Sequence, residues 1–576
     1  MQSLVKFAFL LRSVLFLAAW FLLPIIVVLT LSRLAFSGYA WAHTLESYVR
    51  EVLLYGACFW LWTTVGLIIA LVVHFGLSNT TRDDGVPYFA QVIPAAILVV
   101  VSVGAYGITV WENDKDYGRY YANATAYYVT NPSEVPDSLK SLAADAGSSE
   151  VCDLLGAHDV YGCVREGALN VEGWEPRVSS LQGATNAIRR KTDGVQRVGL
   201  RSETVMYLNA TDDAPAVWSG VLNGSGKEQP LYGVAEWAGI GDPKVCRFEG
   251  EYAIKRAFDS QRGNNMDNLL KEQFPRLRSK LSDAWGYCDG DEPVVVLPMT
   301  KRETIGSFFD GRVVDTAAGV VTIRGKQGEP TLTYEPEVKA GTYRGPVYPD
   351  SLVGQQRESL QWTAGRKNKN RLDFGYDPSE SGVQVGNGAE YLLRDVATGR
   401  NVYVTPLTLR SSSSEVFVAY SVTYADEVKS GELNELSVYV LDRDDDRLVN
   451  IDQLAAEAND WMSRNAGTFR SNGGRMIEFT PINGDTWRVF GEMGGQVVYQ
   501  LDISASNKIA PKLVSLSRTD ADDGAVSPEE DAAQDVETPS AGDGSACGPD
   551  LGQLDNAALA ACLNAVSSEL QQRLGQ

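Results

Sequence analysis

The chain has 576 residues, of which 44% are hydrophobic and 22% are charged, and its formal net charge is −22. It is too long for one ordinary domain. Residues 1–111 hold five basic and four acidic side chains, a balance of +1, so residues 112–576 carry −23. Because so acidic a surface repels phosphate backbones, we expect no nucleic-acid partner.

Three long apolar runs cover about residues 13–31, 52–74 and 88–110, and the strongly polar stretch 112–116 follows the last. Each run can cross a hydrocarbon core of roughly 30 Å as a helix. The first run follows two basic residues, as a signal peptide does, but it contains Pro24 and two further runs follow it. We therefore predict a membrane domain, residues 1–111, with three uncleaved transmembrane helices.

The charges around these runs predict an orientation. Lys6 and Arg12 precede the first run, which favours a cytoplasmic N-terminus and places residues 112–576 outside the cytoplasm. No acidic residue lies within the runs, and their single ionisable group is His74, at the end of the second. Ion pathways need intramembrane polar groups, so the runs indicate an anchor. The lipid bilayer is then one expected partner.

Seven cysteines are present, and Cys58 lies inside the second apolar run, where we expect it to pack. The other six follow the membrane block and form three local pairs with no zinc-site spacing. We interpret them as disulfide candidates in an oxidising compartment, against the alternative of six free thiols in the cytosol. The candidates are Cys152 with Cys163, Cys246 with Cys288, and Cys547 with Cys562.

Residues 112–290 are predicted to form an α+β domain outside the cytoplasm. A short helix is expected over 136–146, and apolar spacing of three and four between Met266 and Leu281 predicts a helical stretch that Pro275 kinks or divides. Short apolar runs separated by turn formers predict strands. These strands are Thr204–Leu208, Ala216–Leu222 and Leu231–Trp237.

Residues 291–518 change to a β-rich pattern, with short β-branched and aromatic runs that indicate a largely antiparallel domain. This region forms one domain or two, with a seam near 365–370. One helix is predicted over Asp452–Arg464, preceded by a capping-box variant of Asn450 and Gln453. The strands expected are Val294–Leu297, Val320–Ile323, Thr331–Tyr334, Tyr391–Arg394, Val402–Thr405, Val416–Val422, Leu436–Leu441, Met476–Phe479, Trp487–Phe490, Val497–Leu501 and Leu513–Leu516.

The last part of the chain divides into an arm and a helix. Residues 519–546 contain nine acidic residues and no basic one, so we predict a disordered acidic linker. Residues 547–576 are predicted to hold a C-terminal helix over about 554–574 with one apolar face. That helix docks either on a partner or on its own chain.

Motifs that carry chemistry are scarce. Only His158 lies after the membrane block, which argues against histidine-based triads and zinc sites. Residues 224–227 lack the full phosphate-loop pattern and are interpreted as a hairpin turn, and Gly239-Ile240-Gly241 lacks the third glycine of a dinucleotide fingerprint. Residues 442–447 space carboxylates as calcium loops do, but Arg447 replaces the required glycine. We therefore assign no catalytic, cofactor-binding or metal-binding residue and expect no cofactor.

Together these patterns favour a multi-pass, membrane-anchored protein of the cell envelope. Its large extracytoplasmic region is expected to bind or assemble other molecules. The patterns are more consistent with a binding protein than with an enzyme. Other envelope or membrane proteins are the expected partners. One alternative is an envelope enzyme that acts on glycan through paired carboxylates. The other is a sensor or accessory subunit of a membrane complex.

Overall fold

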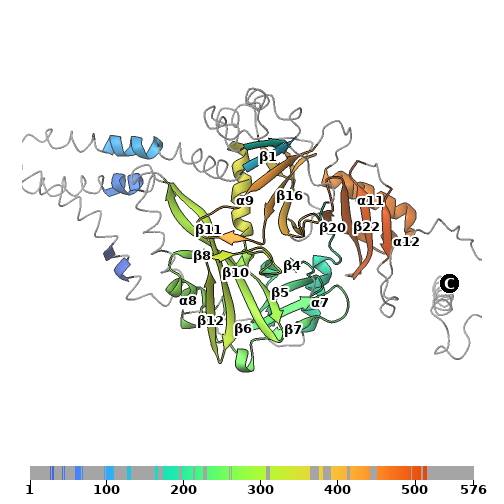
Figure 1. Cartoon of the computed structure of the whole chain (residues 1–576), viewed down its shortest axis with the longest axis horizontal. Helices are drawn as coiled ribbons and strands as arrows, with labels where there is room; N and C mark the ends of the chain where they lie inside the picture. Colours follow the sequence, from blue (N-terminus) through green and yellow to red (C-terminus); the bar gives the residue numbers. More distant parts are fainter. Residues whose placement is uncertain are drawn as a thin grey trace, which may run out of the picture. The chain divides into compact units, whose positions relative to one another are not determined.

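The fold was analysed in a computed structural model that describes residues 126–130, 163–166 and most of 173–515, with short pieces between 26 and 108 (Figure 1). The pieces are residues 26–27, 29–31, 42, 45, 59–66, 68, 97 and 99–108. Within 173–515 the gaps are 194–197, 212–213, 225–229, 259, 261, 306–311, 363–374, 380–390, 411–415, 442–449, 495 and 507–509. The statements below concern the described residues.

The three predicted spans lie largely outside those residues. The pieces that are described, among them 59–66 and 99–108, are helical. Within the described part of the chain, no helix combines the length and the apolar character that a membrane crossing requires. The predicted helices at 136–146 and 554–574 and the predicted linker 519–546 also lie outside the described residues.

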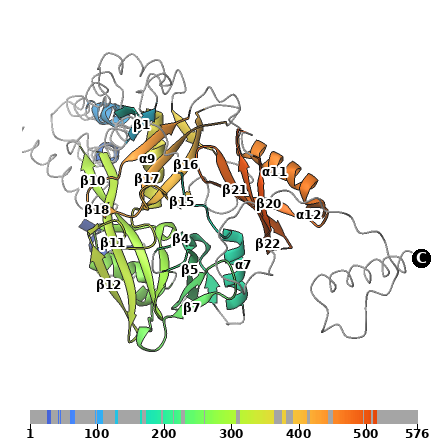
Figure 2. The ribbon, with the colours of Figure 1, turned by 45° about the vertical axis from the view of Figure 1, so that its right-hand side comes forward.

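The remainder is β-rich with mainly antiparallel pairing, as the sequence predicts (Figures 1 and 2). One sheet, the β3–β7 sheet, is followed in the chain by a second, the β8–β12 sheet. The strands of the first are β3 (Val198–Leu200), β4 (Met206–Leu208), β5 (Val217–Gly224), β6 (Leu231–Trp237) and β7 (Lys244–Arg247). Those of the second are β8 (Leu277–Ser279), β9 (Trp285–Asp289), β10 (Glu292–Ile305), β11 (Arg312–Lys326) and β12 (Glu329–Glu335).

A seven-stranded sheet and the β20–β23 sheet complete the larger sheets, and a two-stranded pair joins β13 (Glu337–Val338) to β18 (Val428–Lys429). The seven strands are β1 (Ala126–Thr130), β2 (Cys163–Glu166), β14 (Tyr376–Pro378), β15 (Tyr391–Arg394), β16 (Asn401–Leu409), β17 (Phe417–Tyr424) and β19 (Leu436–Val440). The last sheet holds β20 (Arg475–Pro481), β21 (Thr486–Met493), β22 (Gln496–Ser504) and β23 (Lys512–Ser515).

The continuous apolar run in β10 is explained by burial on both faces of its sheet. Successive side chains of a strand point to opposite faces. Val294 and Val296 enter a core shared with the seven-stranded sheet, whereas Val295 and Leu297 enter a core shared with β5 and β6. The seven-stranded sheet is likewise covered twice, because Tyr403 and Val404 of β16 enter different cores. Strand segments buried on both faces favour continuous apolar sequence, as in Val294–Leu297 of β10 and Val402–Val404 of β16.

A disulfide joins the β3–β7 sheet to the β8–β12 sheet. Cys246 of β7 is bonded to Cys288 of β9, and the two are 42 residues apart in sequence. The backbone N–H of Cys288 also donates a hydrogen bond to Glu236 of β6, 2.9 Å away. This confirms one of the three predicted pairs. Cys163 begins β2, and Cys152, Cys547 and Cys562 lie outside the described residues.

The segment after the third apolar run adds strands to the seven-stranded sheet. β1 pairs in parallel with β19 on one side and with β2 on the other, whereas the other pairings of this sheet are antiparallel. β1 begins 15 residues after Trp111. The part of the chain nearest the predicted membrane exit is therefore hydrogen-bonded to strands from the C-terminal half.

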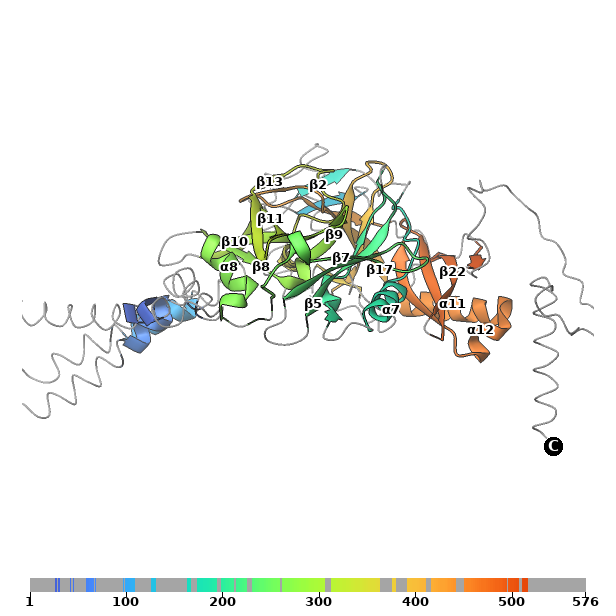
Figure 3. The ribbon, with the colours of Figure 1, turned by 90° about the horizontal axis from the view of Figure 1, so that it is seen from below.

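Two helices show how local sequence decides local structure. α11 (Ile451–Asn465) packs on β20 and β22 and is followed by α12 (Gly467–Ser471), as Figure 3 shows. Its capping box is confirmed, because Asn450 accepts from the Gln453 backbone and Gln453 accepts from the Asn450 backbone. The helical stretch predicted from Met266 to Leu281 is only partly correct. α8 (Met266–Gln273) ends before Pro275, and strand β8 follows.

α9 (Asp350–Glu358) receives its N-terminal cap from a distant residue. Pro349 occupies the N-cap position and provides no side-chain cap. Instead, Asp283 accepts hydrogen bonds from the Ser351 backbone N–H at 2.9 Å and from the Ser351 hydroxyl at 2.6 Å. Burial raises the pKa of Asp283 to about 6, while these hydrogen bonds act in the opposite direction. Negative charge is favourable at a helix N-terminus. Asp283, which lies just before β9, therefore holds the N-terminus of α9 next to that strand.

The boundary that the sequence places between residues 290 and 291 falls in the turn between β9 and β10. These strands are hydrogen-bonded neighbours, with Asp289 opposite Glu292. The β8–β12 sheet therefore extends across this position. The described residues between 126 and 515 belong to one compact unit.

The disulfide should matter for stability. Replacing Cys246 and Cys288 together by Ala removes a cross-link that limits the unfolded chain, and we expect the free energy of unfolding to fall by about 2–4 kcal/mol. Urea unfolding of the full chain in detergent, with and without reductant, measures this. Reductant should destabilise the wild type more than the double variant. Equal effects on both would contradict the assignment.

Candidate functional site

Residues 173–180, the 173–180 segment, contact three of the sheets within a few residues. The Trp174 backbone N–H donates to Ile482 beyond β20, and that of Glu175 donates to Arg394 of β15. Further along, the Trp218 indole of β5 donates to the Ser179 carbonyl at 3.0 Å. The segment therefore connects the β20–β23 sheet, the seven-stranded sheet and the β3–β7 sheet.

Arg177 is the buried centre of this segment, with 3% of its surface exposed. Its guanidinium carbon lies 5.1 Å from the ring centroid of Trp218, 5.7 Å from that of Tyr207 and 5.8 Å from that of Tyr391. Aromatic faces attract cations, and the attraction strengthens when both groups are removed from water. One guanidinium nitrogen also donates to the Leu392 carbonyl at 3.4 Å. Rings from two sheets thus surround one cation.

Glu478 supplies the negative charge near Arg177 and caps α7 (Leu181–Thr192). One carboxylate oxygen accepts from the Leu181 backbone N–H at 2.6 Å, and the other accepts from Gln182 at 2.8 Å. Ser180 caps the same helix through the Gly183 N–H. Burial raises the pKa of Glu478 to about 7, whereas the two backbone hydrogen bonds and the charge of Arg177 act against this rise.

The backbone at Glu478 is unusual. Its φ is +55°, a left-handed conformation that side chains other than glycine rarely adopt. The register between β20 and β21 shifts between Ile477 and Thr480, so Glu478 lies in a β-bulge. Bulges redirect side chains out of the regular alternation. Here the bulge directs the carboxylate towards α7.

A small apolar surface lies beside this cluster at the turn between β6 and β7. Ile240 is 78% exposed and Val178 is 55% exposed. Their two segments approach each other, because a Cβ on Gly239 would lie 3.1 Å from the Ser179 Cβ. Trp237, at the end of β6, is partly buried, and its indole donates to Gly241 at 3.0 Å. We refer to these three side chains together as the Val178–Trp237–Ile240 patch. Figure 2 shows α7 beside β5 and β7 in this part of the molecule.

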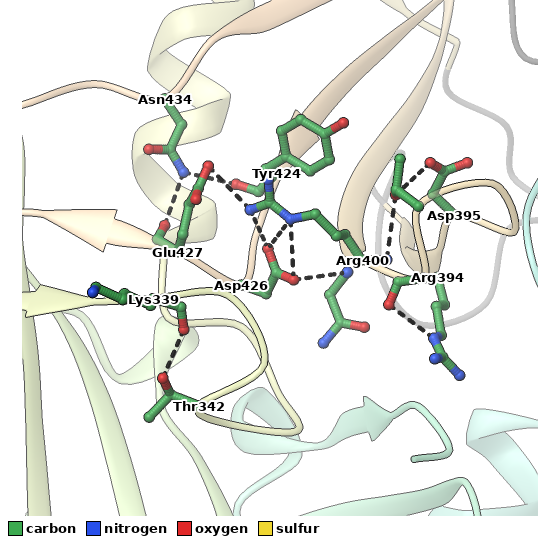
Figure 4. A network of polar contacts seen from close by, with 12 residues as sticks. Lys339, Thr342, Arg394, Asp395, Arg400, Tyr424, Asp426, Glu427 and Asn434 are labelled. Atoms are coloured by element: carbon green, nitrogen blue, oxygen red, sulfur yellow. Dashed lines mark hydrogen bonds and ion pairs between the residues drawn. The ribbon is translucent and has the colours of Figure 1, made fainter. Parts of the chain in front are cut away.

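A second polar network, shown in Figure 4, surrounds Arg400 at the turn between β15 and β16. Arg400 binds Asp426 at 2.6 Å and Glu427 at 3.0 Å, and its guanidinium lies 3.9 Å from the Tyr424 ring centroid. Asn434 donates to the backbone carbonyls of Tyr424 and Glu427. The network fixes the turn after β17 against the start of β16. Its groups are satisfied by one another, which is typical of a structural role.

The motifs noted in the sequence are only partly described by the structure. Gly224 ends β5, which pairs antiparallel with β6, and residues 225–227 lie outside the described residues. Gly239 and Gly241 have φ of +98° and +72° in the β6–β7 turn. His74, His158 and residues 442–447 lie outside the described residues. Among the described residues, no group of three or more His, Cys, Asp or Glu side chains is arranged to hold a metal ion.

Neither Arg177 nor Glu478 was assigned from sequence. Arg177 lies in Glu-Pro-Arg-Val, a polar stretch, and Glu478 lies within a predicted strand, Met476–Phe479. The one available signal is a charged residue inside an apolar strand pattern. Comparison with known proteins gives no match to a protein-family model, to a curated protein or to a solved structure.

The buried cation should contribute strongly to stability. Changing Arg177 to Met leaves Glu478 buried without its cation, and we expect a loss of about 3–5 kcal/mol in the free energy of unfolding. The matched control is Lys429→Ala, which breaks a solvent-exposed pair with Glu432 and should leave the free energy of unfolding nearly unchanged. Chemical unfolding of both variants gives the comparison. Equal, small losses would show that Arg177 contributes no more than a surface charge.

Proposed function

We propose that this chain is a membrane-anchored protein of the cell envelope whose large β-rich region lies outside the cytoplasm and binds or assembles other envelope proteins. The proposal combines the three apolar runs of the sequence with the burial pattern and the cross-links described above.

The burial pattern of the N-terminal helical pieces is the observation that carries the proposal. Ser102 is 4% exposed, whereas its neighbours Val101 and Val103 are 55% and 49% exposed. In the second run, Thr64 is 7% exposed and Val65 is 40% exposed. Proteins in water bury valine and expose serine and threonine. The reverse arrangement suits helices whose outer faces contact lipid and whose small polar groups face one another.

Two further features support the location of the β-rich region. The Cys246–Cys288 disulfide is typical of oxidising compartments outside the cytoplasm. The second feature is that β1 begins only 15 residues after Trp111, which supports a short connection between an anchor and the seven-stranded sheet. A region held in this way is suited to present a binding surface near the membrane.

The Val178–Trp237–Ile240 patch is our candidate for that surface. Contiguous exposed apolar surface often marks an interaction site, and aromatic residues are enriched at protein interfaces. Its borders are polar, with Lys191 paired to Asp242 at 2.7 Å. An apolar centre with a polar rim is the arrangement of protein-binding sites. We therefore assign the patch to a partner protein.

Membrane anchoring predicts that the chain stays in the membrane pellet after extraction at alkaline pH, because apolar helices do not leave the bilayer when surface charges are titrated. Immunoblotting of pellet and supernatant measures this. A peripheral membrane protein of the same cells serves as the release control. Recovery of the chain in the supernatant would contradict the anchor.

The sidedness is tested on whole cells with a membrane-impermeant maleimide after reduction, followed by peptide mapping. Label is expected on Cys547, which follows the anchor, and on Cys58 only after detergent treatment. If Cys547 reacts only in broken cells, the extracytoplasmic placement is wrong.

The patch predicts a specific contact. A photo-crosslinking amino acid at position 240 should give a discrete adduct in native membranes. The same amino acid at position 396 is the control, because Val396 is also exposed, at 44%, but lies on the β15–β16 turn. Gel mobility after irradiation measures both. Adducts of equal intensity at the two positions, or none at 240, would exclude the patch as the binding surface.

A further inference from the structure

Glu478 is a carboxylate that connects two parts of the fold far apart in sequence. Its oxygens accept from backbone N–H groups 296 and 297 residues away, at the first turn of α7. The residue is 5% exposed and has the left-handed backbone described above. Such a conformation costs about 1–2 kcal/mol and persists only where surrounding contacts hold it.

The geometry makes this contact sensitive to charge. A carboxylate that accepts two N–H bonds at a helix N-terminus is favoured when ionised. Burial away from water disfavours the same ionised form. The two effects oppose each other at one side chain, so its proton equilibrium depends on whether the contact is closed.

Arg177 is the cation whose charge lowers the pKa of Glu478. Other charged groups lie on the elements around Glu478. α7 has no acidic residue in its first turn, and its basic residues Arg189, Arg190 and Lys191 lie in the last turn. Burial raises the pKa of Tyr207, which keeps that hydroxyl neutral. The neighbouring ion pairs are Arg475–Glu492, Arg488–Asp502 and Arg394–Glu175, and Tyr391 packs on Arg177.

We propose that Glu478 and the first turn of α7 form a proton-sensitive joint, closed most firmly in acid and loosened as the pH rises past neutrality. When the joint opens, the α7 N-terminus and the 173–180 segment separate from β20, while the β20–β23 sheet stays packed on the seven-stranded sheet through its own core. That core includes Trp487 stacked on Phe417, with ring centroids 5.0 Å apart.

The direction follows from linkage. In the closed joint burial raises the pKa of Glu478 from 4.5 to about 7, and in the open joint the side chain regains its ordinary pKa. The closed state therefore binds a proton that the open state releases. Closure is favoured below the ordinary pKa, and this advantage is lost as the pH rises through about 7. Between pH 5 and pH 8 the opening equilibrium should increase on the order of 10- to 100-fold.

Hydrogen exchange of the full chain in detergent, followed by mass spectrometry, tests the joint. After correction for the intrinsic effect of pH, protection of the first turn of α7 should fall on the order of 10- to 100-fold from pH 5 to pH 8. The internal control is the first turn of α11, which the neutral pair Asn450 and Gln453 caps, and its protection should stay constant. A wild-type protein in which both helices behave alike overturns the proposal, and this outcome requires no variant.

The variant Glu478→Gln removes the titrating group and keeps one acceptor oxygen. Its first turn of α7 should show protection that no longer depends on pH. The matched variant Glu492→Gln changes another buried carboxylate of the same sheet and should keep the wild-type pH dependence. If the protection of this turn still depends on pH in Glu478→Gln, another group causes the effect and the proposal is wrong.

Discussion

A single buried cation, Arg177, lies where three sheets of this protein are joined by the 173–180 segment. Apolar cores join the sheets, and one of them contains Leu208 of the β3–β7 sheet, Val296 of the β8–β12 sheet and Tyr403 of the seven-stranded sheet. The 173–180 segment adds hydrogen bonds to three sheets, and Arg177 lies among rings from two of them. Among the described residues, Glu478 in the bulge of β20 is the carboxyl group whose charge acts on Arg177.

Carboxylates that cap helices from a distance recur in this fold. Asp283 caps α9 and Glu478 caps α7, in each case from a segment far away in sequence. α11, by contrast, is capped by residues on either side of its own N-terminus. A local cap stabilises the helix alone, whereas a distant cap also fixes where the helix lies. Both distant caps are carboxyl groups whose pKa burial raises, so we expect the contacts that hold α7 and α9 to respond to pH. The cap of α11 is formed by neutral side chains and should not respond.

The sequence predicts the features that depend on neighbouring residues. The strands from Val294 onwards, the capping box of Asn450 and Gln453, and the pairing of Cys246 with Cys288 follow from local patterns. It fails where distant contacts decide. Leu277 continues a helical spacing after Pro275, yet it forms a strand because β10 offers its backbone to β8. The partnership of Arg177 with Glu478 has no local signal, since neither residue stands in a recognisable motif.

The separation between the 173–180 segment and β20 has a consequence for biosynthesis. Chains are made from the N-terminus at about 5–20 residues per second, so α7 precedes Glu478 by roughly 15 to 60 s. During that interval Arg177 has neither its anion nor the ring of Tyr391, which follow it in the chain. The nascent polypeptide must keep this arginine in water or on a chaperone until the last sheet emerges. Completion of the fold is thus postponed to the end of translation, when one late carboxylate reaches an early helix.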